Sequence, residues 1–213
     1  MKQFDYMEKW KKLLTPQIVS YLTTIHEYKG KQHLIAERHA DVLENLVEIA
    51  KIQSTESSNK IEGIYTSDER LKKIVLDKTM PKTRNEREIA GYRDVLNTIH
   101  ENFQHIPIRD TFILQLHRDL YKFENASYGG RFKTADNIIE EEDERGNKFV
   151  RFRPLPAWET PDAIINLCTA YNEAINKGEA DSLLLIPMFI IDFLCIHPFD
   201  DGNVTLRYCE NVA

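Results

Sequence analysis

The sequence predicts an all-α, mainly helical domain that carries one small β-hairpin. Over most of the chain, apolar residues recur at intervals of three and four, which is the spacing of amphipathic helices. The segment 136–153 instead alternates apolar and polar residues around a Gly-Asn turn, which is typical of a hairpin. With 42% hydrophobic and 29% charged residues, the chain can bury a sizeable core without disulfides.

The first 30 residues are expected to form a helical arm that docks on the core, and exposed apolar residues of this arm could support a homo-oligomer. Its apolar residues follow a helical spacing at Phe4, Met7, Trp10 and Leu14. The core then extends over residues 31–213. Its first predicted helix covers residues 31–53, before a polar stretch, STESSNK, interrupts the apolar pattern.

Further helices are predicted from near Asp68, over 84–103, over 109–123, from Thr160 to Gly178, and over 182–196. Ser67 is a suitable N-cap for the first of these. Thr160 is the expected N-cap of the fourth, which Gly178 should end.

The hairpin is expected to have arms near residues 137–141 and 148–152, with the turn at Gly146–Asn147. An isolated hairpin is only marginally stable in water, so we expect this one to lean on the helices as a flap. The alternative is a solvated acidic loop, since the stretch between the arms is rich in glutamate and aspartate.

Charge and cysteine content narrow the class of protein. A net charge of −6 argues against a general nucleic-acid or anionic-membrane binder. The longest apolar run, 183–196, is too short to span a bilayer and contains Pro187 and Asp192. The N-terminus lacks the apolar core of a signal peptide. Cys168 and Cys195 lie in apolar runs as expected for buried thiols, so we expect a cytoplasmic protein without a membrane or nucleic-acid partner.

A short polar motif, HPFDDGN, begins at His197, where the last apolar helix should end. The histidine can take a proton near neutral pH, and the two aspartates are oxygen ligands suited to Mg²⁺ beside phosphate. Gly202 and Asn203 tolerate a backbone that presents N–H groups to an anion. The motif therefore indicates phosphoryl or nucleotidyl transfer, and the alternative is a plain helix stop followed by a turn.

HPFDDGN resembles the first half of the Fic family motif, H-P-F-x-[D/E]-G-N-G-R-x-x-R, at every defined position. YGGRFKTADNII is similar to the family's approach to its flap hairpin, and an apolar helix delivers the motif, as in the family. The resemblance extends roughly over residues 30–203. It implies the mainly helical Fic fold and transfer of AMP from ATP to a Ser, Thr or Tyr hydroxyl of a target protein, possibly of the chain itself.

The resemblance also implies roles for single residues. By matching position, His197 would be the general base and Asp201 the Mg²⁺ ligand. Gly202 and Asn203 would bind the nucleotide phosphates, and Pro198 and Phe199 would anchor the loop. The target segment would add to the edge of the flap as a β-strand.

A second segment, SNKIEG, is similar to the inhibitory helix that some Fic proteins carry before the core, with the pattern [S/T]-x-x-x-E-[G/N]. Ser58 and Glu62 are four residues apart and Gly63 follows, so a helix over about 54–63 would present both side chains on one face. A carboxylate directed at the nucleotide site would repel a γ-phosphate. The alternative is a solvated helix end that stops at Gly63.

The motif departs from the family pattern after Asn203. Val204 and Thr205 occupy the positions of the second glycine and the first arginine, and Arg207 matches the last arginine only if one residue is missing. Three explanations are open: a diverged loop, a truncated or frame-shifted gene, or residues missing before Ala213. We favour the last two, which would leave the core incomplete at its C-terminal end.

Two other functions therefore stay open. One is a catalytically impaired nucleotide-binding homologue that acts as an interaction or toxin–antitoxin module. The other is transfer of a different phosphate-containing group.

Overall fold

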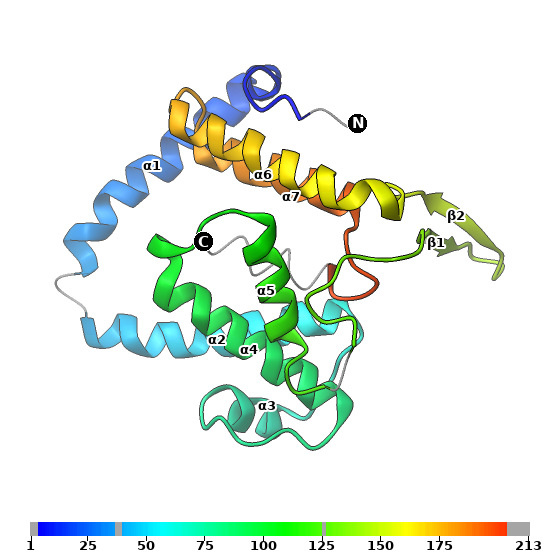
Figure 1. Ribbon diagram of the computed structural model, residues 1–213. Helices are drawn as coiled ribbons and strands as arrows, with labels where there is room; N and C mark the ends of the chain where they lie inside the picture. Colours follow the sequence, from blue (N-terminus) through cyan, green and yellow to red (C-terminus); the bar gives the residue numbers. More distant parts are fainter. Residues whose placement is uncertain (1–3, 37–39, 125–126, 204–213) are drawn as a thin grey trace.

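The computed structural model describes residues 4–36, 40–124 and 127–203. Within these ranges the chain is mainly helical with one two-stranded antiparallel sheet, which confirms the predicted fold class (Figure 1). The longer helices are α1 (Pro16–Ala36), α2 (Ala40–Ile61), α4 (Arg84–Asn102), α5 (Asp110–Leu120), α6 (Thr160–Lys177) and α7 (Ser182–Ile196). The shorter elements are η1 (Lys9–Leu13), α3 (Asp68–Val75), η2 (Phe103–His105), η3 (Ala157–Glu159) and the strands β1 (Ile139–Glu142) and β2 (Lys148–Phe152).

The main core lies where α4 packs on α5 and α6 packs on α7. Its fully buried members include Tyr92 of α4, Phe193 of α7 and Phe199 of the motif that follows α7. The helices α4 and α5 meet at Gly91, where an added Cβ would lie only 1.8 Å from the Leu120 carbonyl oxygen. Such a close approach of two backbones requires glycine. This contact fixes the end of α5, from which the chain continues towards the active-site region.

A smaller cluster holds α3 against α4. Leu71, Ile74 and Val75 of α3 are buried with Ile89 and Ala90 of α4. Ser67 caps α3 as predicted, because its side chain accepts the N–H of Arg70.

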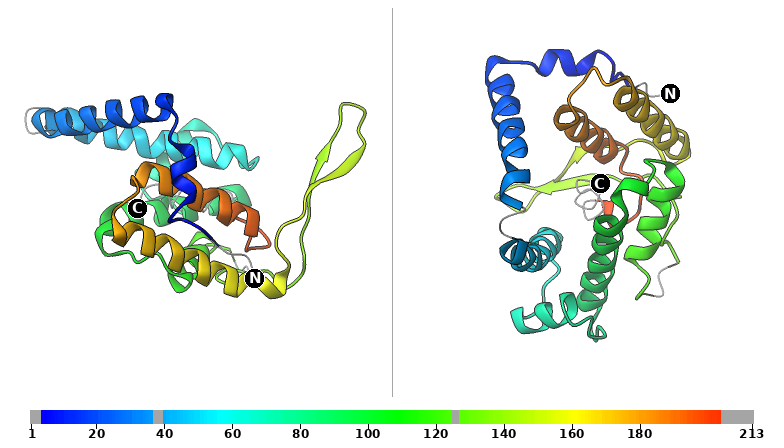
Figure 2. Two further views of the ribbon diagram at one scale, coloured as in Figure 1. Left: turned by 90° about the horizontal axis from the view of Figure 1, so that it is seen from above. Right: turned by 90° about the vertical axis from the view of Figure 1, so that its left-hand side faces the viewer.

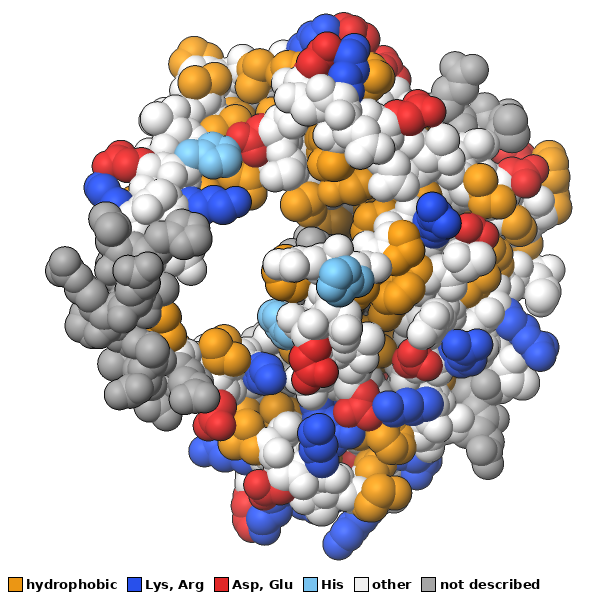
Figure 3. Space-filling model, turned by 60° about the vertical axis from the view of Figure 1, so that its left-hand side comes forward, with side chains coloured by type: hydrophobic (Ala, Val, Ile, Leu, Met, Phe, Trp, Pro, Cys, Tyr) orange, Lys and Arg blue, Asp and Glu red, His pale blue; other side chains and the backbone are white. Residues whose placement is uncertain are grey.

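The N-terminal region divides into a docked part and an exposed part. Tyr6 is 1% exposed, and its hydroxyl donates to Asp192 of α7 at 2.9 Å. By contrast, α1 runs outside the body, and Figures 1 and 3 show an open space beside it. Its large apolar side chains are between 47% and 68% exposed at Val19, Tyr21, Ile25 and Tyr28. The domain boundary predicted after residue 30 falls inside α1.

The prediction of one helix over 31–53 was wrong at both ends. Residues 31–36 continue α1, and α2 runs through the polar stretch to Ile61. Polar residues are compatible with a helix when tertiary contacts bury them, and Thr55, Ser58 and Asn59 are at most 4% exposed. Residues 84–102 and 110–120 form the predicted helices α4 and α5.

The ends of α6 and α7 follow local capping rules with one correction. Gly178 ends α6 with φ 68°, as predicted. Thr160 is not the N-cap of α6 but its first residue, and its hydroxyl donates to the Pro156 carbonyl at 3.0 Å. Asp181 caps α7 by accepting the N–H of Leu183.

The hairpin forms with the predicted turn, but it does not lean on the helices. Ile139 pairs with Phe152 and Glu142 with Lys148, and Gly146 has φ 83°. All five residues of β2 are exposed, and Figure 2 shows the hairpin projecting away from the helical body. The base of the hairpin is nevertheless hydrogen-bonded to the start of η3, because Asp136 accepts the N–H of Ala157 at 2.7 Å.

None of the helices in the described part of the chain has the length and apolar character needed to cross a membrane.

Candidate active site

His197 stands at the C-cap of α7 in a left-handed backbone conformation, with φ 51° and ψ 65°. This left-handed backbone conformation costs a residue other than glycine about 1–2 kcal/mol. The N–H of His197 still donates to the Phe193 carbonyl at 2.9 Å. Pro198 comes next, and proline disfavours the right-handed helical region for the residue before it. The helix therefore stops at Ile196, as predicted from the sequence, with His197 as its C-cap.

The imidazole of His197 is half-buried, and its Nδ1 is buried without a hydrogen-bond partner among the described residues. Burial lowers the pKa of His197, and the positive charge of Lys133 lowers it further. The ring is therefore neutral at neutral pH and can accept a proton. Since Nδ1 is buried, Nε2 is the nitrogen that a substrate could reach.

The loop after His197 is anchored by Phe199, which is fully buried and stacks on His117 of α5. The two ring centroids are 3.8 Å apart and the planes differ by 8°. Nδ1 of His117 accepts the N–H of Gly130 at 3.0 Å, so the ring proton is on Nε2, which donates to the Asp201 carbonyl at 3.1 Å. Burial lowers the pKa of His117 to about 4, against the opposing effect of this carbonyl.

Gly202 bends the loop where it meets the end of α5. Its φ is 75°, and an added Cβ would lie 2.8 Å from the Tyr121 hydroxyl. Asn203 then closes the turn, because its Oδ1 accepts the N–H of Phe199 at 2.9 Å and its Nδ2 donates to the Phe199 carbonyl at 2.8 Å. The amide of Asn203 is therefore engaged inside the loop, and its backbone N–H is the group that remains for an anion.

The two aspartates of the motif differ. Asp200 is exposed, whereas Oδ1 of Asp201 accepts the N–H of Gly202 at 2.8 Å. Oδ2 of Asp201 lies 3.9 Å from Nη2 of Arg84, and the Asp201 side chain is 45% exposed. Among the described residues, no three His, Cys, Asp or Glu side chains gather as a metal site. Asp201 is a single carboxylate, so it could hold a Mg²⁺ ion only together with phosphate and water oxygens.

The segment before the hairpin runs along the loop and is hydrogen-bonded to it. The N–H of Lys133 donates to the Pro198 carbonyl at 2.8 Å, and its ammonium donates to the Ile196 carbonyl at 3.0 Å. Asn137 accepts from the same ammonium at 2.9 Å and donates to the Phe199 carbonyl at 3.3 Å. The approach to the flap and the active-site loop are thus one connected unit.

The segment predicted to be inhibitory forms the end of α2. The hydroxyls of Ser58 and Tyr92 are 2.9 Å apart in the interior. Glu62 is the last residue before Gly63, which has φ 75°. The N–H of Gly63 donates to the Lys60 carbonyl and the N–H of Ile64 to the Asn59 carbonyl, which is the Schellman pattern of a helix C-terminus.

Glu62 lies close to the active-site loop through Tyr121. Together with Tyr121 and Glu88 it lines a small cavity between α2, α4 and α5. Burial raises the pKa of Tyr121, and the Asp201 carboxylate is the largest of the charges that raise it further, followed by Tyr128, Glu88 and Glu62. Tyr121 therefore stands between Gly202 on one side and the end of α2 on the other.

The structure brings most of the predicted site residues into two neighbouring groups. His197, Pro198, Phe199, Asp201, Gly202 and Asn203 form the loop. Ser58 in the last turn of α2, with Glu62 and Gly63 directly after the helix, forms the second group. Arg207 lies outside the described residues. Sequence reasoning missed His117, Tyr121, Lys133 and Asn137. A signal existed for His117, a titratable residue on the apolar stripe of Ile113, Leu116 and Leu120.

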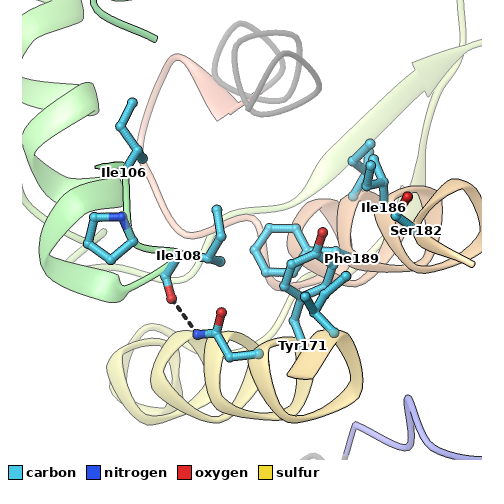
Figure 4. Close-up of a pocket in the computed structure, with 10 residues that line it drawn as sticks. Ile106, Ile108, Tyr171, Ser182, Ile186 and Phe189 are labelled. Atoms are coloured by element: carbon cyan, nitrogen blue, oxygen red, sulfur yellow. Dashed lines mark hydrogen bonds between the residues drawn. The ribbon is translucent and has the colours of Figure 1, made fainter. Parts of the chain in front are cut away.

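A larger cavity lies away from the loop, between η2, α6 and α7. It measures about 400 Å³, and Figure 4 shows Ile106, Ile108, Tyr171, Ile186 and Phe189 around it. Asn172 donates to the Ile108 carbonyl at 2.8 Å on its floor. On the face shown in Figure 3, apolar side chains are visible beside a hollow. The residues that line the 400 Å³ cavity include no carboxylate, histidine, lysine or arginine, so this cavity is not a candidate active site.

Comparisons with known proteins agree with this geometry. A sequence model of the Fic/DOC family matches residues 107–208. A Fic domain-containing signaling protein from Bacteroides thetaiotaomicron has 21% identity and a TM-score of 0.69, over 81% of this chain and 65% of that one. A Fic family protein from Desulfovibrio desulfuricans has 20% identity and a TM-score of 0.71, over 93% and 57%.

Fic-1 from C. elegans is also similar, with 17% identity and a TM-score of 0.61, over 97% of this chain and 62% of that one. The chain therefore spans less than two thirds of the length of each of these structures. A comparison with curated proteins found no match. The match over 107–208, the helical fold and the loop HPFDDGN together support a Fic/DOC-type domain in this part of the chain.

Proposed function

We propose that this protein is an autoinhibited protein adenylyltransferase, which transfers AMP from ATP to a Ser, Thr or Tyr hydroxyl of a target protein. The observation that carries the proposal is the loop itself. It joins a neutral, substrate-accessible imidazole at His197 to a carboxylate at Asp201 and a glycine bend at Gly202, all fixed to the core through Phe199. The match of residues 107–208 to the Fic/DOC family model supports the same reaction class.

In the proposed reaction, Nε2 of His197 takes the proton of the target hydroxyl. The hydroxyl oxygen forms a bond to the α-phosphorus, the bond to the β-phosphate breaks, and pyrophosphate leaves. Asp201 would hold Mg²⁺, which supplies charge neutralisation of the phosphates. The N–H of Gly202 now donates to Oδ1 of Asp201, so a carboxylate that turns to a cation would free this N–H for a phosphate oxygen.

We infer that Glu62 restrains this activity. The end of α2 is held in the interior by Ser58, and Glu62 borders a cavity that it shares with Tyr121, the residue packed on Gly202. A carboxylate here adds negative charge to the side of the loop where the phosphates of ATP would lie, and it would repel them. Glu62→Gln keeps the size of the side chain and should raise both transfer and ATP affinity. Loss of activity together with stability would contradict this role.

The projecting hairpin is the proposed dock for the target protein. Both strands are exposed, and each leaves one edge unpaired because the described sheet has only two strands. An extended segment could add to such an edge through backbone hydrogen bonds. The exposed apolar side chains of α1 suit a homo-oligomer contact.

Transfer of label from α-³²P-ATP to protein tests the proposal, with Glu62→Gln as the released background. His197→Ala should lower transfer at least about 100-fold, which is the usual size of a general-base effect, with an unchanged circular dichroism spectrum. Equal transfer by both proteins would exclude His197 as the base. Competition with UTP and GTP would reveal transfer of a different group.

A second candidate is an impaired nucleotide-binding homologue that serves as an interaction module. Val204 and Thr205, in place of the family's glycine and arginine, favour it. Loss of a charge-assisted contact to phosphate costs about 1.5–3 kcal/mol. Calorimetry with Mg·ATP separates the two: micromolar binding without label transfer favours the module, and binding with transfer favours the enzyme.

A further inference from the structure

Lys133 is a buried cation beside the proposed catalytic base. It is 3% exposed although lysine is almost never buried without partners. Its partners are unusual, because its ammonium and its backbone N–H bind the carbonyls of Ile196 and Pro198. These two carbonyls belong to the residues immediately before and after His197. Asn137 supports the clamp by accepting from the same ammonium.

His197 needs such support for two reasons. Its backbone is left-handed with φ 51°, a conformation that a histidine adopts only when its surroundings hold it there. Its Nδ1 has no hydrogen-bond partner among the described residues, so no side chain there orients the ring through that nitrogen. The backbone that carries the imidazole is held instead at the Ile196 carbonyl, in the peptide group before His197, and at the Pro198 carbonyl, one peptide group beyond it, and Lys133 binds both.

We propose that Lys133 is a positioning residue for His197, which binds the carbonyls of the residues before and after the histidine and places a positive charge beside its ring. The inference rests on the proposed role of His197 as the base. The charge has a second consequence, because it opposes protonation of the imidazole. Burial lowers the pKa of Lys133 to about 8, while Asp136 and Asp200 act in the opposite direction. The ammonium therefore stays largely charged at pH 7.

The test follows the titration of His197 by NMR in protein labelled at histidine, which needs neither ATP nor a target. The signal is assigned with His197→Asn. In Lys133→Met the positive charge is gone, so the imidazole should titrate at higher pH than in the parent. Lys133→Arg retains the charge and should keep the titration near that of the parent. Lys73→Met, an exposed lysine of α3, is the matched control and should leave it unchanged.

An unchanged His197 titration in a folded Lys133→Met protein would overturn the electrostatic role. Because this variant could fail to fold, the parent protein supplies a second measurement. When Lys133 loses its proton, the His197 signal should show a further inflection near pH 8. A flat signal through that range counts against the proposal.

Activity gives an independent result if transfer is detected. Misplacing a catalytic group by about 1 Å can cost on the order of 100-fold, so Lys133→Met should lower kcat about 10- to 100-fold with little change in the KM for ATP. Lys133→Arg should recover most of it. A rise in KM at constant kcat would show that Lys133 serves nucleotide binding instead, and would overturn the positioning role. Failure of transfer in every variant would count against the proposed function and leave the NMR result standing.

Discussion

The active-site loop and the helix α1 are opposite extremes of one chain. The loop is short and irregular, yet Phe199 is completely buried, and His117, Lys133, Asn137 and Asn203 bond its backbone. The helix α1 is long and regular, yet most of its apolar side chains are exposed, and its described tie to the body is His26 to Asp181 at 2.6 Å. Regular secondary structure and firm tertiary anchoring are therefore separate properties.

The comparison teaches where this protein can move. Local opening costs least where few apolar contacts hold an element. Both regimes occur along α2, because Leu46, Val47 and Ile49 in its first half are about half exposed, whereas Thr55, Ser58 and Asn59 near its end are buried. We therefore expect the first half of α2 to open more readily than its end.

The same substitution should have opposite effects in the packed helical body and in α1. Gly91→Ala places a methyl group 1.8 Å from the Leu120 carbonyl oxygen, and overpacking of this kind typically costs about 1–3 kcal/mol. Because backbone atoms must move, we expect the upper end of that range. Gly30→Ala in α1 meets nothing within 4 Å and should stabilise by about 0.5–1 kcal/mol. Urea unfolding of both variants measures the difference, and equal signs would contradict the comparison.

Gly202→Ala should break the loop more locally. It combines a positive φ with a contact to Tyr121 at 2.8 Å, so we expect a loss of about 2 kcal/mol in stability. Gly178→Ala is the control, because its φ is also positive but no atom lies within 4 Å. Gly178→Ala should lose only the stability that the positive φ costs an alanine, about 1 kcal/mol. If thermal unfolding shows the two variants to be equally destabilised, the Tyr121 contact carries no free energy.

Acid should weaken the body before it affects α1. Hydrogen bonds from Arg70, opposed by burial and aided by the N–H of Lys82, lower the pKa of Glu86 to about 2. Since the folded state favours the carboxylate, this contribution is present above about pH 4.5 and is lost as the pH falls towards 2. Because Arg70 is partly solvated, we expect roughly 1–2 kcal/mol.

Urea unfolding between pH 2 and 6 measures this loss. Glu86→Gln should flatten the pH dependence over that window. Glu27→Gln removes the exposed Glu27–Lys31 pair of α1 and should leave the curve as in the parent. A parent-like curve in Glu86→Gln would assign the acid sensitivity to other carboxylates.

The smallest expected effect lies at the junction of the two regions. Ser58→Ala removes the hydroxyl that lies 2.9 Å from the buried Tyr92 hydroxyl, and should cost about 1 kcal/mol. The neighbouring Ser57→Ala is exposed and should stay within about 0.5 kcal/mol of the parent. Hydrogen exchange of α2 should increase in the first variant alone. Equal exchange in both would show that Ser58 does not hold the end of this helix.

The sequence by itself determined the helical class, the bounds of α4, the stop of α6 at Gly178 and the loop after Ile196. These depend on local chemistry, namely apolar spacing, capping and the proline that follows His197. It also indicated the two groups of candidate site residues, because each is a short continuous motif. The prediction for α2 was wrong, since a polar stretch there remains helical because it is buried and the Ser58 hydroxyl contacts the Tyr92 hydroxyl.

Only the tertiary structure decided which side chains support the loop. His117, Lys133 and Asn137 come from segments 62 to 84 residues away in the chain, and their partners are mostly backbone carbonyls, which no side-chain pattern encodes. It also decided that the hairpin projects instead of lying on the helices, since alternation on a strand does not say which face is covered. Burial, and with it the neutral imidazole of His197, depends on packing brought together from across the chain.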